Sequence, residues 1–267
     1  MRYADYVEDF SRWASLGELG TYGEAVHDGT RYPYLRLVVD GARWLTITAG
    51  FHGDEQSGPR TLLRSMDRVV AWARQHDVGL RVYPCLNPTG FEDTTRYNRA
   101  HQRPNNDLLR YELPGGHVRG ELLPGQRFKR WYVRTTPGAA ETDALLPELE
   151  QHAPPVAALD LHQDPFHEGP GSYAYVFGER SGFHSMVRAC RGFAPIVAQQ
   201  QVDDVVPLST DEHGLLEYAD GSITDYFWRR GVRWAAALET TTDTDPEACH
   251  QVNLAWIHGF IERAAAG

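Results

Sequence analysis

Short apolar runs alternate with longer amphipathic stretches along most of the chain, and this pattern predicts a fold of strands and helices. The runs with the apolar and β-branched composition of buried strands are 32–40, 44–50, 80–88, 156–162, 172–179 and 233–239. The stretches with helical patterns are 3–16, 58–76, 141–152, 183–193 and 246–265. Strands that alternate with helices predict a doubly wound α/β sheet.

The stretch 99–137 breaks this alternation. It carries many glycines and prolines among polar residues, and we expect a long irregular excursion there. The chain shows no internal repeat and no low-complexity linker, so we expect a single domain over residues 1–267.

Composition and charge narrow the choice of partners and compartment. The 267 residues are 42% hydrophobic and 23% charged, which is typical of a globular protein, and the formal net charge of −10 argues against a nucleic-acid partner. The three cysteines form no CxxC pair, which suits a reducing compartment. No stretch has the length and apolar character of a membrane span or a signal peptide, so we expect a cytoplasmic protein without a membrane partner.

Metal-capable side chains stand at the ends of three predicted strands. His52 and Glu55 follow 44–50 in "TAGFHGDEQSGP", His162 ends the run 156–162, and Glu239 ends the run 233–239. In open α/β sheets, sites form beyond the carboxyl ends of the strands. A catalytic zinc needs three nitrogen or oxygen ligands and an open position for water, which His52, Glu55 and His162 would provide. Glu239 would be left as a general base.

Each of these residues also has a structural explanation. His-x-x-Glu in a loop is weak evidence for a metal, His162 may be read as a core histidine with a satisfied hydrogen bond, and Glu239 as the start of a solvated loop. The coincidence of all of them at strand ends favours the metal site.

Five motifs, in order, resemble those of zinc carboxypeptidases of the carboxypeptidase A type. They are "TAGFHGDEQSGP", "CLNPTGFEDTTR", "PGAAETDAL", "LDLHQDP" and "GSITDYFWRRGVRWAAALET", and they extend from about residue 32 to about residue 240. The wider group includes murein-peptide amidases, aspartoacylases and succinylglutamate desuccinylases. The resemblance implies a mixed, twisted sheet of about eight strands with helices on both faces.

The resemblance also implies roles for individual residues. His52, Glu55 and His162 correspond to the ligands of one zinc ion per chain, and Glu239 to the general base that later donates a proton. Arg96 corresponds to the arginine that stabilises the oxyanion. Tyr218 lies near the place of the family's mobile substrate-binding tyrosine, although a core tyrosine explains it equally well.

One motif departs from the family pattern. The family's Asp-x-Asn-Arg, in which Asn-Arg grips the substrate's terminal carboxylate, is matched here by "RPNN": Asn105 keeps the asparagine, Arg103 replaces the aspartate and Asn106 replaces the arginine. Either Arg99, Arg103 or Arg110 takes over the task, or the substrate lacks a carboxylate there. The residue that supports His52 is also open, with Asp107 and Asp160 as the two alternatives.

These observations lead to a functional expectation with two rivals. We expect a zinc-dependent hydrolase that cleaves an amide bond in a small peptide or peptide-like substrate, with a metallocarboxypeptidase-like mechanism. The enzymatic rival is an N-acyl amino acid deacylase of the aspartoacylase or succinylglutamate desuccinylase type. The other rival is a non-catalytic binding protein on the same fold, which the intact His52, Glu55, His162, Arg96 and Glu239 disfavour. The motifs HExxH, GxSxG and GxxxxGK[ST] are absent from the sequence.

Overall fold

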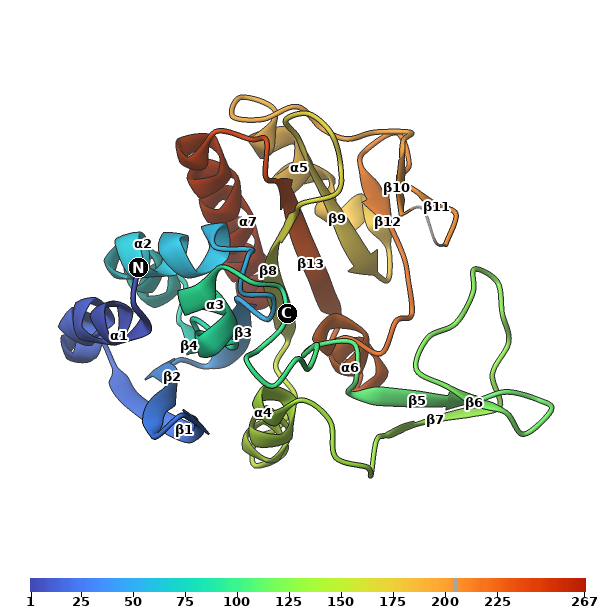
Figure 1. Cartoon of the computed structure of the whole chain (residues 1–267). Coiled ribbons are helices and arrows are strands. Elements are labelled where there is room, and N and C mark those ends of the chain that lie inside the picture. The colour runs from blue at the N-terminus through green and yellow to red at the C-terminus, as the bar shows by residue number, and fades with distance from the viewer. Residues whose placement is uncertain (204–205) are drawn as a thin grey trace.

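The computed structural model describes residues 1–203 and 206–267, and a mixed sheet of eight strands forms its centre (Figure 1). In spatial order the strands are β1 (Glu18–His27), β2 (Thr30–Val39), β4 (Val78–Tyr83), β3 (Arg43–Ala49), β8 (Ala157–Asp164), β13 (Trp234–Thr241), β9 (Ser172–Phe177) and β12 (Leu215–Leu216). The central strands β4, β3, β8 and β13 are parallel to one another. Antiparallel pairs flank them on both sides, β1–β2 and β2–β4 on one and β13–β9 on the other.

Helices cover both faces of this sheet. The helices are α1 (Tyr3–Ser11), α2 (Ser57–Gln75), α3 (Pro88–Asp93), α4 (Ala140–Glu150), α5 (His184–Cys190), α6 (Ile223–Arg229) and α7 (Pro246–Ala266), with short 3-10 turns at Arg12–Ser15 and Arg180–Phe183. One hydrophobic cluster joins the sheet to α2, α5 and α7, and a second joins it to α4 and α6. The expected mixed α/β fold, with about eight strands and helices on both faces, is confirmed.

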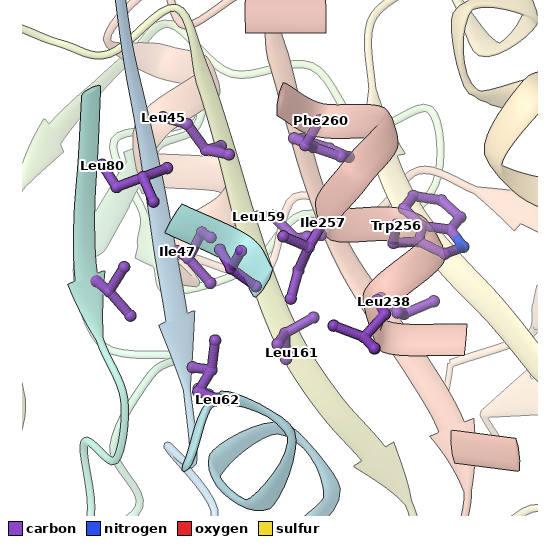
Figure 2. Packing of buried hydrophobic residues seen from close by; sticks show 14 of the residues in the cluster. Leu45, Ile47, Leu62, Leu80, Leu159, Leu161, Leu238, Trp256, Ile257 and Phe260 are labelled. Carbon is purple, nitrogen blue, oxygen red and sulfur yellow. The ribbon is translucent and has the colours of Figure 1, made fainter. Parts of the chain in front are cut away.

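The alternation of side chains along the central strands explains the two clusters. On β3, Leu45 and Ile47 point into the cluster beneath α2 and α7, while Thr46 and Thr48 are on the opposite face. Figure 2 shows leucine and isoleucine side chains of β3 and β8 packed together with Ile257 and Phe260 of α7. Because both faces are covered, the strands are apolar over most of their length.

The stretch 99–137 differs in part from the expectation of an irregular excursion. Three of its segments, β5 (Leu109–Glu112), β6 (Val118–Arg119) and β7 (Arg130–Val133), pair as a separate antiparallel sheet. This small sheet projects from the body of the molecule (Figure 1). A further two-stranded pair consists of β10 (Gln201–Asp203) and β11 (Leu208–Ser209). Strand β1 and helix α6 were also not predicted.

The predicted strand 80–88 ends early, and its end helps to build the site. Strand β4 stops at Tyr83, and Asn87 caps helix α3 by accepting a hydrogen bond from the Gly90 amide at 2.9 Å. Pro88 occupies the first position of the helix, where a missing N–H costs nothing. The "NPTG" motif is therefore a turn that places α3 beside the end of β3.

Two further observations concern the cysteines and the helices. Cys85, Cys190 and Cys249 are free and buried, and burial raises the pKa of the Cys190 thiol to about 12. Within residues 1–203 and 206–267, no helix combines the length and apolar character that a membrane span requires.

Candidate metal centre

The turn after β3 carries His52 and Glu55 to the carboxyl edge of the sheet. Gly50 has a positive φ of 71°, which a glycine adopts without strain. A Cβ atom at Gly53 would lie 1.9 Å from the carbonyl carbon of Gly90, so only glycine lets this turn lie against α3. The Glu55 amide closes the turn by donating to the His52 carbonyl at 3.2 Å. The glycines of the motif therefore hold two polar side chains in a fixed place.

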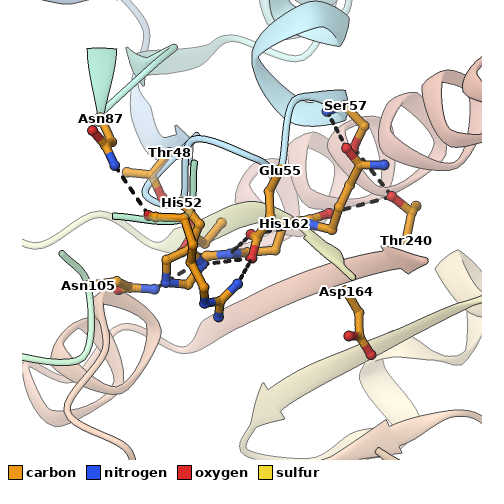
Figure 3. Close-up of polar contacts among 12 residues, drawn as sticks. Thr48, His52, Glu55, Ser57, Asn87, Asn105, His162, Asp164 and Thr240 are labelled. Atoms are coloured by element: carbon orange, nitrogen blue, oxygen red, sulfur yellow. Dashed lines mark hydrogen bonds and ion pairs between the residues drawn. The ribbon is translucent and has the colours of Figure 1, made fainter. Parts of the chain in front are cut away.

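Three donor side chains converge at this edge (Figure 3). The His52 Nδ1 atom lies 2.7 Å from Glu55 Oε1, and the His162 Nδ1 atom lies 2.6 Å from Glu55 Oε2. One ligand atom from each residue falls within 4.8 Å of the others, and all three residues are buried. Two imidazoles and one carboxylate fit a divalent metal that prefers nitrogen and oxygen ligands, such as zinc.

A buried carboxylate fixes the orientation of His162. The His162 Nε2 atom lies 2.5 Å from Asp160 Oδ2, and the Thr48 hydroxyl donates to Asp160 Oδ1 at 2.7 Å. With Nε2 bonded to Asp160, Nδ1 is the nitrogen that faces Glu55 and that would bind a metal once it has lost its proton. The structure therefore assigns Asp160 to His162, and not to His52 as one of the two alternatives had it.

His52 lacks the support that we expected from Asp107 or Asp160. Asp107 accepts from the Ala139 amide at 3.0 Å and lies 3.3 Å from the Arg134 guanidinium. Within the described part of the chain, the buried His52 Nε2 atom has no hydrogen-bond partner. No described carboxylate therefore supports the His52 Nε2 atom as Asp160 supports His162.

Burial and charge act differently on the two histidines. Burial lowers the pKa of His52 to about 4, so its imidazole is neutral near pH 7, as a metal ligand must be. Burial acts in the same direction on His162, but the carboxylates of Asp160 and Glu55 outweigh it and raise the pKa of His162 well above its usual value. Of the two histidines, His162 is therefore the one that carries positive charge in the metal-free cluster.

Arg96 reaches the centre from the loop after α3. One of its guanidinium nitrogens, Nη1, lies 2.6 Å from Glu55 Oε1, and its carbonyl accepts from the Asn87 side chain at 3.4 Å. The ring of Phe166 stands 5.3 Å from the guanidinium carbon and is 74% exposed. Arg96 is thus held between a buried carboxylate and an exposed aromatic ring.

Glu239 lies beside His162 in the sheet. The two residues are direct partners in the parallel pairing of β13 with β8, and Tyr173 is the partner of Glu239 on β9. Burial raises the pKa of Glu239 well above its usual value, and its Oε2 atom is buried without a partner among the described residues. A carboxyl group with one buried, unpartnered oxygen next to a candidate metal centre is suited to proton transfer.

The expected substrate-binding residues differ in their placement. Asn105, at a φ of 90°, accepts from the Ile223 amide at 2.8 Å, and its Nδ2 atom lies 3.4 Å from His162 Nε2. Tyr218 is half-buried and donates to Glu121 at 2.8 Å. Arg103 is exposed and forms no ion pair with any described residue. The structure brings Asn105, but not Tyr218 or Arg103, into contact with the metal-ligand set.

Two of the three alternative arginines are engaged elsewhere. Arg99 bonds both oxygens of Asp93 and also reaches Glu92 at 3.0 Å. The Arg110 guanidinium donates to the backbone carbonyls of Asp107 and Leu109. Within residues 1–203 and 206–267, Arg103 is therefore the one of the three that forms neither a hydrogen bond nor an ion pair.

Several residues of the site escaped the sequence analysis. Asp160 was named, but for the wrong histidine; its spacing of two from His162 on one strand places both on the same face and could have indicated the contact. Phe166 and Asp220 were not singled out. Their contacts with Arg96 and Asn106 join segments far apart in the chain, for which one sequence holds no signal.

Comparison with known proteins supports the fold. No family model matches the chain, and no curated protein sequence matches it. Among solved structures, a candidate metallopeptidase from Shewanella amazonensis is 24% identical with a TM-score of 0.73, over 99% of this chain and 94% of that one. Another, from Shewanella denitrificans, is 21% identical with a TM-score of 0.73, over 98% and 90%.

A metallo-carboxypeptidase from Burkholderia cenocepacia is also similar in structure. It is 12% identical with a TM-score of 0.66, over 97% of this chain and 68% of that one. These likenesses confirm the expected metallocarboxypeptidase-like fold. At these identities they leave the substrate and the reaction to be argued from the site.

Proposed function

We propose that the chain is a zinc-dependent hydrolase that cleaves an amide bond in a small peptide or peptide-like substrate. The observation that carries this proposal is the buried set of His52, Glu55 and His162, with Glu239 as the direct strand partner of His162. A purely structural polar cluster would pair its carboxyl groups, whereas Glu239 Oε2 is buried without a partner in the described part of the chain.

The residues divide the work of such a reaction between them. His52, Glu55 and His162 would hold zinc, which when bound supplies a Lewis acid that activates water and polarises a carbonyl. Glu239 takes a proton from the attacking water and later gives it to the leaving amine. Arg96, whose charge is permanent, stabilises the negative charge that develops on the carbonyl oxygen.

The geometry favours this division of roles. Arg96 lies against Glu55, which also contacts both histidines. Its guanidinium is therefore within reach of the place between the three candidate ligands. The direct pairing of Glu239 with His162 in the sheet supports its role as the proton acceptor. Asp160 and Thr48 keep His162 in the tautomer that presents Nδ1.

A metal assay followed by a substrate panel tests the proposal. The purified protein should hold about one zinc per chain, because the set offers three ligands and leaves one position open. The zinc-loaded protein should then release amines from short peptides or peptide-like amides. Selective hydrolysis of N-acyl amino acids would replace the peptide substrate with the deacylase alternative. Zinc binding without hydrolysis across the panel would favour a non-catalytic protein and overturn the proposal.

A further inference from the structure

Next to the metal centre, Asn106 is held by a carboxylate. Its Nδ2 atom donates to Asp220 Oδ2 at 2.6 Å, and Asp220 Oδ1 accepts from the Ser222 amide at 3.0 Å. The Asn106 Oδ1 atom is buried without a partner among the described residues. Where the family pattern has an arginine, this chain therefore presents an amide and a carboxylate.

Two contacts place this pair beside the reacting groups. Asn105, the neighbour of Asn106, touches His162 through Nδ2 and accepts from the Ile223 amide through Oδ1. The segment 105–106 is thus tied at two points to the segment 220–223, at the side of His162. Asp220 belongs to the surroundings of the metal centre and not to a separate surface.

Tyr175 lies on the same face of the sheet as the proposed general base. It lies on β9 two residues after Tyr173, the partner of Glu239, so both tyrosines are on the face of the sheet that carries Glu239. Burial raises the pKa of the Tyr175 hydroxyl, and the charges of Glu239 and Asp220 raise it further.

The charge of Asp220 is not compensated by an ion pair with any described residue. Burial raises the pKa of Asp220, whereas hydrogen bonds from Ser222 and, more weakly, the charge of the exposed Arg103 lower it. A positive group brought next to this carboxylate would regain interactions that burial has removed. A second carboxylate brought there would meet like charge.

We propose that Asp220 selects substrates that carry a positively charged group, such as a primary amine, close to the scissile amide, and that it disfavours a carboxylate at that place. This inference rests on the proposed hydrolase function and specifies its substrate class. Asn106 has a positioning role, because it holds Asp220 Oδ2 in place through its own amide.

Asp220 also has a structural role, and substitution can separate the two. Its Oδ1 atom closes the turn that leads into α6, a task that an asparagine side chain performs equally well. Asp220→Asn should therefore keep the fold and remove the charge. If the role is only structural, the ranking of substrates will not change.

The first experiment uses matched amide substrates that differ in one group. Each substrate carries a carboxylate, a carboxamide or an aminomethyl group. In one series this group is on the leaving-amine half of the substrate, and in a second series it is on the acyl half. In wild type we expect kcat/KM for the amine to exceed that for the carboxylate by about tenfold or more in one series. Asp220→Asn should erase this ratio. Glu217→Gln, which removes an exposed charge from the same segment, should leave it unchanged.

A pair of further variants makes the prediction sharper. An arginine introduced by Asn106→Arg would lie against Asp220 and be neutralised by it, so this single change should abolish the amine preference without creating a grip on carboxylates. The double variant Asn106→Arg with Asp220→Asn leaves that arginine unpaired and should reverse the preference toward the carboxylate. Non-additivity of the two changes is the expected signature.

Two outcomes would overturn the inference. The first is a preference of wild type for the carboxylate; if Arg103→Ala then loses this carboxylate preference, the recognition belongs to that arginine. The second is an amine preference that survives Asp220→Asn. If no substrate is hydrolysed, the proposed function fails, and binding still decides the charge preference. In that case butylamine should raise the Tm of zinc-loaded wild type more than that of Asp220→Asn, while butyrate and butyramide should not discriminate between them. Equal shifts with butylamine would refute the inference.

Discussion

At the scale of single residues, the side chains of the site are held by their immediate neighbours. His162 is fixed by Asp160, the Glu239 Oε2 atom is buried without a partner in the described part of the chain, and Arg96 is held between Glu55 and Phe166. Such pre-positioning matters because a catalytic group contributes only when it is aligned before the reaction.

Loss of His162 should remove metal and activity together. His162→Ala deletes one of three ligands and leaves Asp160 buried without its imidazole partner, so zinc content after dialysis should fall well below one per chain. His117→Ala, at an exposed site, is the matched control and should keep full occupancy. An unchanged zinc content and rate in His162→Ala would contradict the ligand assignment.

Glu239→Gln should separate binding from chemistry. The amide keeps the size of the side chain but cannot accept the proton, so kcat should fall by about 10² to 10⁴-fold while zinc content stays the same. The comparison is made at equal zinc content, with Glu217→Gln as a control for the loss of one negative charge. Near-normal turnover would mean that Glu239 is only a polar residue at the end of a strand.

At the scale of secondary-structure elements, close contacts between turns keep the ligands together. The turn that carries His52 lies against α3 with only the two glycines Gly53 and Gly90 between them. Helix α2 follows directly, and its Gly58 lies against Leu161 of β8, one residue before His162. The metal ligands from two strands are thus connected through glycine contacts as well as through their side chains.

Gly53→Ala should therefore weaken both the fold and the metal site. The added methyl group would overlap the Gly90 backbone, and the turn can avoid it only by moving His52; we expect a loss of about 2–4 kcal/mol in unfolding free energy and weaker zinc binding. Gly192→Ala meets no atom within 4 Å and should be nearly neutral. Denaturant titration and zinc competition with a chelator measure the two effects.

Helix α6 carries a buried carboxylate with an unusual titration. Burial raises the pKa of Asp225 from 3.8 to about 6, although the Tyr111 hydroxyl and Arg229 oppose this. Because the folded state binds the proton more tightly than the unfolded state, Asp225 disfavours the fold above pH 6. This penalty disappears as the pH falls through 6 toward 4.

The resulting pH dependence can be measured as a difference between two proteins. Between pH 8 and pH 4.5, Asp225 should contribute about 2 kcal/mol of additional stability to wild type, a contribution that Asp225→Asn cannot show. Urea unfolding of both metal-free proteins at the two pH values gives the quantity directly. A pH-independent difference between the proteins would contradict the raised pKa.

At the scale of the whole molecule, the metal should stabilise the fold. Three buried donors from β8 and the turn after β3 lose their compensation when the ion is removed. Zinc at about a thousand times its Kd would stabilise the folded state by about 4 kcal/mol. Chelation should therefore lower the Tm by at least several degrees, and His162→Ala should show no such response. An equal response of both proteins would indicate that the chelator acts elsewhere.

The sequence was sufficient for the centre of the molecule because its signals there are local. The apolar runs that become β3, β8 and β13 are long, and His162 and Glu239 mark their ends. Strand β1 was missed because it is an edge strand, interrupted by Gly20 and Gly23 and exposed at many positions, so its apolar pattern is weak. Helix α6 has only seven residues, too few for a periodic signal.

The surroundings of the site were less predictable for a different reason. The contacts of Phe166 with Arg96 and of Asp220 with Asn106 are tertiary, and no spacing rule along the chain brings these residues together. The same holds for Asp107, whose partner Arg134 lies across the small sheet of β5, β6 and β7. Motifs pointed to the candidate ligands, whereas only the folded chain shows their neighbours.

Because all three cysteines are buried, the surface of the folded protein presents no native thiol to a labelling reagent. Cys85, Cys190 and Cys249 are inaccessible in the folded protein, so maleimide reagents should react with it only after it opens. A cysteine introduced by Arg119→Cys on β6 would then be the one reactive thiol of the folded chain. A fluorophore placed there would report how the projecting sheet moves when a substrate binds, without removal of any native residue from the core.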